Sequence, residues 1–190
     1  FARLLGIPQE ASPVFNLSYW IYFALPLLDR LHPDPMWRRI EASGLALTAT
    51  ARGGPTDWSV LSDDHRAEPA PGRARVFGYN GIRIPLYLLL DGYFVPALSD
   101  RLHGAWGTPS ADVPFTFRHG DGRALEPMNL SGYRLIHSLT HCVATGETID
   151  MALLGNGPDT YYSTSLFLLA VNVLYTHYPG CFPRLDGNWP

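Results

Sequence analysis

The sequence predicts an all-α domain built from helix pairs, with small β-hairpin excursions between them. Hydrophobic residues make up 46% of the 190 residues and charged residues only 16%, which is typical of a chain that buries a core. The 18 glycines and 17 prolines indicate many turns between short elements. Several segments carry apolar residues at helical spacing. The length suits one domain, so residues 1–190 are treated as a single unit.

The first part of the chain predicts a helical hairpin, a short strand and a loop. The expected ranges are helices at 15–31 and 36–52, a β-like run at 56–61 and a polar loop at 62–75. Asn16 or Ser18 can cap the first helix, and Pro33 closes it. Pro35 suits the first position of the second helix, which the glycine at Gly53 ends.

The second part predicts four helices and one β-hairpin. The expected ranges are helices at 79–91, 95–106, 132–144 and 161–175, with strands at 114–117 and 123–125. Pro85 either kinks the helix at 79–91 or lies in its first turn, and Gly92 ends that helix. The Asp121-Gly122 pair between the strands is a strong hairpin signal.

Charge and apolar patterning exclude two classes of partner. All 14 basic residues are Arg and face 17 carboxylates, so no cluster of cations could follow a phosphate backbone, and nucleic-acid binding is not expected. The longest apolar run, 19–28, is too short for a membrane span and is interrupted by Pro26. The first residues show neither an initiator Met nor a signal-peptide pattern, so we expect a processed product or a piece of a longer chain.

The segment 77–87 holds the most informative local pattern. If a helix begins near Asn80, then Tyr79 and Asn80 precede Arg83 by four and three residues, and all three side chains lie toward one helix end. An aromatic face, an amide and a guanidinium together suit a sugar, because the ring stacks on C–H faces and the polar groups bond hydroxyls. The alternative interpretation is an ordinary capped helix whose tyrosine packs in the core.

This segment resembles a motif of glycoside hydrolase family 8, the bacterial cellulases, chitosanases and related endoglucanases, in which Tyr-Asp-Ala-x-Arg is typical. Three further segments resemble family landmarks in the same order: Asn-Leu-Ser-Tyr at 16–19, Thr-Asp-Trp at 56–58, and Tyr161-Tyr162 followed by an apolar run at 166–169. The four landmarks cover most of this chain but only about the C-terminal half of a full family member.

The resemblance implies an (α/α)6 barrel, here as a partial toroid, that acts on β-1,4-linked polysaccharide of the cellulose or β-glucan class. It also implies an inverting mechanism, in which a Glu acid protonates the leaving oxygen and an Asp base activates water. No cofactor or metal is implied, and secretion or a periplasmic location is expected. By resemblance, the residues that bind or position the sugar are Tyr19, Trp58, Tyr79, Arg83, Tyr161 and Tyr162.

The sequence departs from the family at both catalytic positions. The family's acid Glu lies in its N-terminal half, which no segment here matches. The base position is occupied by Asn80, and a neutral amide cannot take a proton from water. Asp57 is the best substitute, because Asp57 and Trp58 precede the helix of Asn80 by one loop. The alternative is that Asp57 caps a turn and Trp58 packs in the core.

These departures leave a second function class open. The chain is either a glycosidase-like domain or a non-catalytic glycan-binding or interaction module derived from that family. A third hypothesis is that an N-terminal half, or self-association, completes the barrel by covering exposed apolar helix faces.

Other patterns favour plain structural roles. Asp63 and Asp64 read as solvated loop residues. His137 and His141 lie four residues apart on an expected helix, but without a third suitably spaced ligand they indicate no metal site. Cys142 and Cys181 permit one disulfide without requiring it, and no serine-nucleophile elbow is present.

Overall fold

The computed structural model describes residues 13–51, 53–109, 113–155 and 159–182, and helices dominate it. The α-helices are α1 (Leu25–Leu31), α2 (Met36–Thr50), α3 (Arg83–Leu90), α4 (Pro96–Trp106), α5 (Ser131–Thr145), α6 (Met151–Leu154) and α7 (Tyr161–Thr176). Short 3-10 turns lie at η2 (Leu17–Tyr19), η3 (Tyr22–Ala24) and η4 (Pro179–Cys181). The predicted architecture of helix pairs with small β excursions is confirmed.

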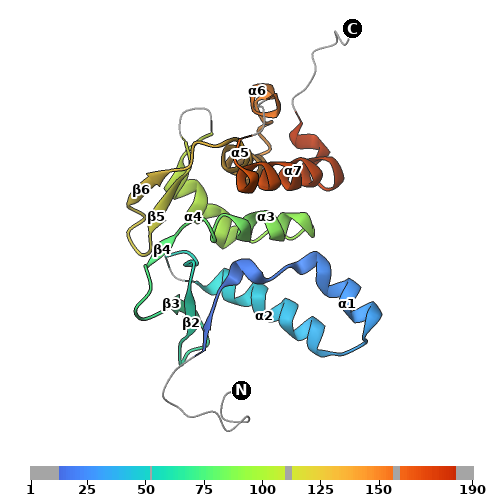
Figure 1. Cartoon of the computed structure of the whole chain (residues 1–190), viewed down its shortest axis with the longest axis vertical. Helices are drawn as coiled ribbons and strands as arrows, with labels where there is room; N and C mark the ends of the chain where they lie inside the picture. Colours follow the sequence, from blue (N-terminus) through green and yellow to red (C-terminus); the bar gives the residue numbers. More distant parts are fainter. Residues whose placement is uncertain (1–12, 52, 110–112, 156–158, 183–190) are drawn as a thin grey trace.

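The helices stack in three tiers along the long axis of the molecule (Figure 1). α1 packs against α2 in the lowest tier, and α3 and α4 form the middle tier. α5 and α7 form the upper tier, where α7 also contacts α3 and α5 also contacts α4. Because each tier touches the next, one continuous hydrophobic core runs through all three.

The pairing of α5 with α7 depends on small residues at their contact. A Cβ at Gly132 would lie 2.1 Å from the carbonyl oxygen of Ser163, so only glycine allows this approach. The backbone N–H of Gly132 donates to Ser163 Oγ at 2.9 Å. Around this contact, Leu135, Leu139 and Ala170 are fully buried. The close approach brings the first turn of α5 beside the first turn of α7.

Two small antiparallel sheets lie along one side of the tiers (Figure 1). One sheet contains β1 (Val14–Phe15), β2 (Ser59–Leu61) and β3 (Ala67–Pro69), and the other contains β4 (Val76–Phe77), β5 (Phe115–Arg118) and β6 (Ala124–Pro127). In the second sheet Phe115 pairs with Pro127 and Phe117 pairs with Ala124, so two residues of β6 lie opposite Thr116. This extra residue is a β-bulge, a feature that re-aims side chains.

The expected helix at 15–31 is wrong over its first half. Only 25–31 is α-helical, and the residues before it form β1 and two 3-10 turns. Pro26 explains the boundary, because proline lacks the N–H that a helix interior needs and is tolerated in a first turn. Asn16 does cap a turn, since its side chain accepts from the N–H of Ser18.

Other boundaries differ by less. The loop expected at 62–75 contains β3, and the helix expected from Tyr79 begins at Arg83, with Pro85 in its first turn. Neither β4 nor α6 was predicted. The short strand at 56–61 and the hairpin at 114–125 are confirmed as β2 and as β5 with β6, within a few residues.

One disulfide joins Cys142 of α5 to Cys181 of η4, across 39 residues of chain. The backbone N–H of Ile149 also donates to the carbonyl oxygen of Cys181 at 2.9 Å. Together these bonds hold the segment after α7 against α5 and against the loop that follows it.

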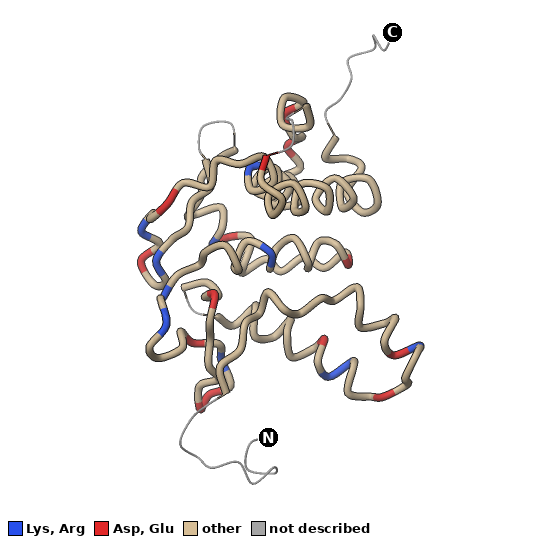
Figure 2. Tube along the Cα trace, viewed as in Figure 1, with Lys and Arg blue, Asp and Glu red and all other residues tan. Residues whose placement is uncertain are grey.

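The outer faces of α1 and α7 are apolar and exposed. α7 carries no charged residue along its length (Figure 2), yet Leu168 is 63% and Tyr175 is 77% exposed. On α1, Leu27 and Leu31 are 53% and 83% exposed. A helix without charges, such as α7, is normally covered by other elements, and α1 adds exposed leucines beside the exposed Arg30, so these faces present a surface suited to further packing.

Candidate functional site

Asp57 organises the turn that leads into α3. Its Oδ1 accepts the backbone N–H groups of Gly78 and Gly81, each at 2.8 Å, and its Oδ2 accepts that of Asn80 at 3.4 Å. A Cβ at Gly78 would lie 2.8 Å from Asp57 Oδ2, which explains the glycine there. The capping alternative for Asp57 therefore agrees with this geometry, and backbone N–H groups engage three of the carboxylate's roughly four lone-pair sites.

Arg83 lies in the first turn of α3 and reaches two segments. Its Nη2 donates to Asn80 Oδ1 at 2.5 Å and to Ser18 Oγ at 2.8 Å. Its Nε is buried and has no hydrogen-bond partner in the described part of the chain. The expected grouping of Asn80 with Arg83 at one helix end is present, and Ser18 of η2 joins it.

The Tyr19 ring lies against Arg83, and the Trp58 ring lies against Tyr19. The Arg83 guanidinium carbon lies 5.5 Å from the centre of the Tyr19 ring, a cation–π distance. Tyr19 meets the Trp58 ring edge to face at 6.2 Å, and Arg73 lies 5.4 Å from the Trp58 ring. Tyr19 is 57% exposed, so its ring is open to a ligand.

A tyrosine cluster lies on the other side, at the meeting of α3, α5 and α7. Tyr79 is 5.7 Å from Tyr133, and Tyr133 is 6.2 Å from Tyr162, measured between ring centres. The Tyr162 hydroxyl donates to the carbonyl oxygen of Tyr79 at 2.5 Å. Burial raises the pKa of Tyr162 to about 12, so this hydroxyl stays protonated and can keep donating at neutral pH.

The acidic side chains at the cluster differ in how they are held. Asp159 accepts from the N–H and the hydroxyl of Ser131, at 2.8 and 2.9 Å. Burial by itself raises its pKa, but these and other hydrogen bonds outweigh it and leave the pKa below the usual range. Glu126 on β6 is exposed, and its Oε2 lies 3.5 Å from the Tyr79 hydroxyl.

The structure thus brings together most of the side chains expected in the site. Tyr19, Asp57, Trp58, Tyr79, Asn80, Arg83 and Tyr162 form one connected surface. Tyr161 is 89% exposed. Ser18, Glu126 and Tyr133 were not predicted as site residues. Ser18 lies inside the quoted motif 16–19, whereas Glu126 and Tyr133 carry no local signal.

Asp64, His137 and His141 each have a partner within the protein. Asp64 bonds the Ser62 hydroxyl and pairs with Arg66 in an exposed loop. His137 bonds the carbonyl oxygen of Gly107, and His141 lies 3.1 Å from Glu147. Within the described ranges, no group of three or more His, Cys, Asp or Glu side chains is placed to hold a metal ion. None of the helices described there combines the length and the hydrophobicity that a membrane span requires.

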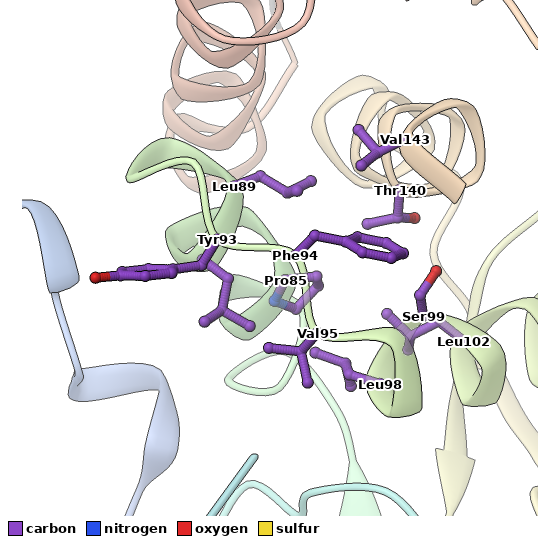
Figure 3. Close-up of a pocket in the computed structure, with 11 residues that line it drawn as sticks. Pro85, Leu89, Tyr93, Phe94, Val95, Leu98, Ser99, Leu102, Thr140 and Val143 are labelled. Atoms are coloured by element: carbon purple, nitrogen blue, oxygen red, sulfur yellow. The ribbon is translucent and has the colours of Figure 1, made fainter. Parts of the chain in front are cut away.

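Three cavities lie away from this surface. One is lined almost entirely by apolar side chains of α3, α4, α5 and the segment before α4, with Phe94 reaching toward Thr140 and Val143 (Figure 3). The two others lie along the flank of α5, around His141. None of these three includes Tyr19, Asn80 or Arg83.

Comparisons with known proteins place this surface in context. No family model matches the sequence. A curated relative, a probable endoglucanase of Novacetimonas hansenii, is 29% identical over 171 residues, which cover 87% of this chain and 49% of the relative. The chain therefore spans about half the length of the curated relative it matches.

Solved structures of endoglucanases also match this chain over about half of their own length. An endo-β-1,4-glucanase of Acetobacter xylinum matches with a TM-score of 0.69 and 25% identity, over 88% of this chain and 53% of that one. A family 8 endo-β-1,4-glucanase from an Achatina fulica gut metagenomic library matches with a TM-score of 0.67 and 27% identity, over 90% and 54%. The resemblance to part of glycoside hydrolase family 8, and the barrel-type helical fold that it implies, are confirmed.

Proposed function

We propose that this chain, a relative of family 8 endoglucanases, forms one wall of a cleft that binds β-1,4-linked polysaccharide. The observation that carries the proposal is the Arg83 guanidinium, whose Nη2 donates to Ser18 and Asn80 beside the exposed Tyr19 ring. Rings that cover sugar C–H faces beside groups that bond hydroxyls are what an oligosaccharide requires. The relatives' names as endoglucanases support the same substrate class.

The geometry favours binding without turnover over hydrolysis. An inverting glycosidase needs a carboxylate that takes a proton from water, and Asn80 offers a neutral amide that already accepts from Arg83. Asp57 is a poor substitute, because three backbone N–H groups occupy its oxygens. Loss of a general base typically removes about 10²–10⁴ in rate. The glycan-binding alternative is therefore the stronger of the two functions.

The exposed faces of α1 and α7 support a partner that completes the cleft. We propose that a second set of helices, in an N-terminal half or in a second copy of this chain, packs on Leu27, Leu31, Leu168 and Tyr175. The relatives carry about as much chain again beyond the matched region, which is consistent with a fuller ring of helices. An extracellular or periplasmic location is proposed with this, supported by the disulfide.

Calorimetric titration with cellohexaose, together with hydrolysis assays on soluble β-glucan and chitosan, tests the function. We expect the wild type to bind and not to hydrolyse, and Arg83→Ala to weaken binding by at least roughly tenfold, because charge-assisted bonds and a cation–π contact are lost. Arg39→Ala, an exposed arginine of α2, is the matched control and should bind as the wild type does.

Asn80→Asp addresses catalysis directly. It restores a carboxylate at the base position, and Ser43→Asp on the exposed side of α2 controls for added charge. Turnover by the wild type would show that another carboxylate acts as base and would reject the binding-only proposal. Absence of binding by the wild type to any of these glycans would reject the glycan site altogether.

A further inference from the structure

We infer that Glu126 is a specificity-determining residue of this site, whose carboxylate accepts hydrogen bonds from sugar hydroxyls at the Tyr79 edge. The inference rests on the proposed glycan-binding function and goes beyond it by assigning a role to a residue outside the motif segments. Two independent observations carry it, one from the backbone of β6 and one from the state of the acids around the tyrosine cluster.

The β-bulge in β6 sets the position of Glu126. Between the pairs Phe115–Pro127 and Phe117–Ala124, both Leu125 and Glu126 lie opposite Thr116. The backbone N–H of Glu126 donates to Thr116 Oγ1 at 3.1 Å, which fixes the bulge. A regular hairpin would break this arrangement, since one residue fewer would turn the side chain at 126 to the other face of the strand.

Glu126 is also the acid at this surface that stays available to a ligand. Asp57 and Asp159 each accept two or more hydrogen bonds from protein donors. In the described part of the chain, the Glu126 carboxylate has only the contact to the Tyr79 hydroxyl, at 3.5 Å, the long limit of a hydrogen bond. An ionised carboxylate has about four lone-pair sites, so most of them remain open.

The chemistry of these two groups suits a polyol. The carboxylate accepts and never donates when ionised, so it recognises hydroxyl protons and rejects other acceptors such as phosphate or carboxylate. Tyr79 presents a ring that is 43% exposed beside it. A sugar unit lying on this ring could place a hydroxyl against Glu126, which gives the tyrosine cluster a defined orientation for its ligand.

The test is cellohexaose titration of the whole chain with Glu126→Gln, Glu126→Asp and a control, Asp100→Asn on the exposed face of α4. Gln keeps the size but removes the charge, so affinity should fall roughly 5- to 10-fold, whereas Asp100→Asn should leave it unchanged. Glu126→Asp should fall between the wild type and Glu126→Gln. Matching thermal unfolding curves would exclude a folding defect.

A second measurement needs no ligand and concerns the contact between Tyr79 and Glu126. Burial and the nearby Glu126 charge raise the pKa of Tyr79, so Glu126→Gln should lower the tyrosinate titration midpoint assigned to Tyr79 by difference from Tyr79→Phe. Equal cellohexaose affinity in the wild type and Glu126→Gln would overturn the inference while leaving the glycan site standing. No binding by the wild type would overturn both.

Discussion

Asp57 is the residue whose role is best defined by its contacts. It receives three backbone N–H groups from the turn before α3, and the same turn places Tyr79 and Asn80 at the site surface. A side chain that organises a turn in this way contributes to stability and to site geometry together. This dual role explains why an acid next to the candidate base position need not act as a base.

Asp57→Ala should therefore destabilise the fold. Three N–H groups lose their acceptor, and we expect the free energy of unfolding in urea to fall by about 2–3 kcal/mol. Asp63→Ala, in the exposed loop, should change it by less than about 0.5 kcal/mol. Equal midpoints and slopes for the two variants would show that Asp57 does not hold the turn.

At the scale of elements, the contact of α5 with α7 decides how the tyrosine cluster forms. Gly132→Ala would place a methyl group 2.1 Å from the Ser163 carbonyl oxygen, so the helices must separate. We expect a loss of about 2–4 kcal/mol, as for other overpacked or disrupted contacts. Gly104→Ala on α4, where a Cβ meets nothing within 4 Å, should be neutral or stabilise by about 0.5–1 kcal/mol. Urea unfolding of both variants measures the difference.

The acid dependence of stability should depend partly on Asp159, which precedes α7 and accepts hydrogen bonds from Ser131 at the start of α5. Burial works to raise the pKa of this carboxyl, but its hydrogen bonds with Ser131 and Ser163 prevail and lower it in the folded state. Its contribution is thus present above its unfolded pKa of about 3.9 and is lost as the pH falls through the folded value. Asp159→Asn should make the free energy of unfolding fall less steeply with pH below about pH 5, because the slope loses the contribution of at most one proton per molecule. Identical pH profiles would contradict this.

The sequence predicted elements best where their own periodicity decided them. The helices at 95–106, 132–144 and 161–175 lie within about a residue of α4, α5 and α7 at each end. The segment 15–24 was misjudged because tertiary contacts shape it: Trp20 Nε1 donates to the carbonyl oxygen of Ile40, and the Tyr22 ring is buried. Apolar spacing alone could not reveal these contacts.

The site residues, like the helices, could be predicted from the sequence only where local spacing groups them. Asn80 and Arg83 lie three residues apart, so local spacing was enough to group them. Glu126 contacts Tyr79 although 47 residues separate the two in the sequence. Tyr133 of α5 contacts Tyr79 because of how the helices pack. A bulge in a short strand and a glycine contact between helices determine those positions, and neither leaves a pattern in the residues nearby.

For the molecule as a whole, the exposed apolar faces predict association. Light scattering after size exclusion should give a mass above the 21.1 kDa of one chain, rising with concentration, unless a partner half is supplied. Leu168→Glu should reduce that mass, because it places a charge on the exposed face of α7. Ser43→Glu, on exposed α2, should not. A strictly monomeric wild type would argue against the packing surface.

The covalent link between Cys142 and Cys181 has a consequence for where this chain can be made. Closing a loop of 39 residues removes unfolded-state entropy worth about 4 kcal/mol in the chain-entropy description. That is a large share of the roughly 5–15 kcal/mol by which domains are stable. The free energy of unfolding would then depend on whether the surroundings keep thiols reduced or allow the disulfide to form. A host that keeps thiols reduced should yield a weaker, more easily degraded product than one that exports the chain to an oxidising space.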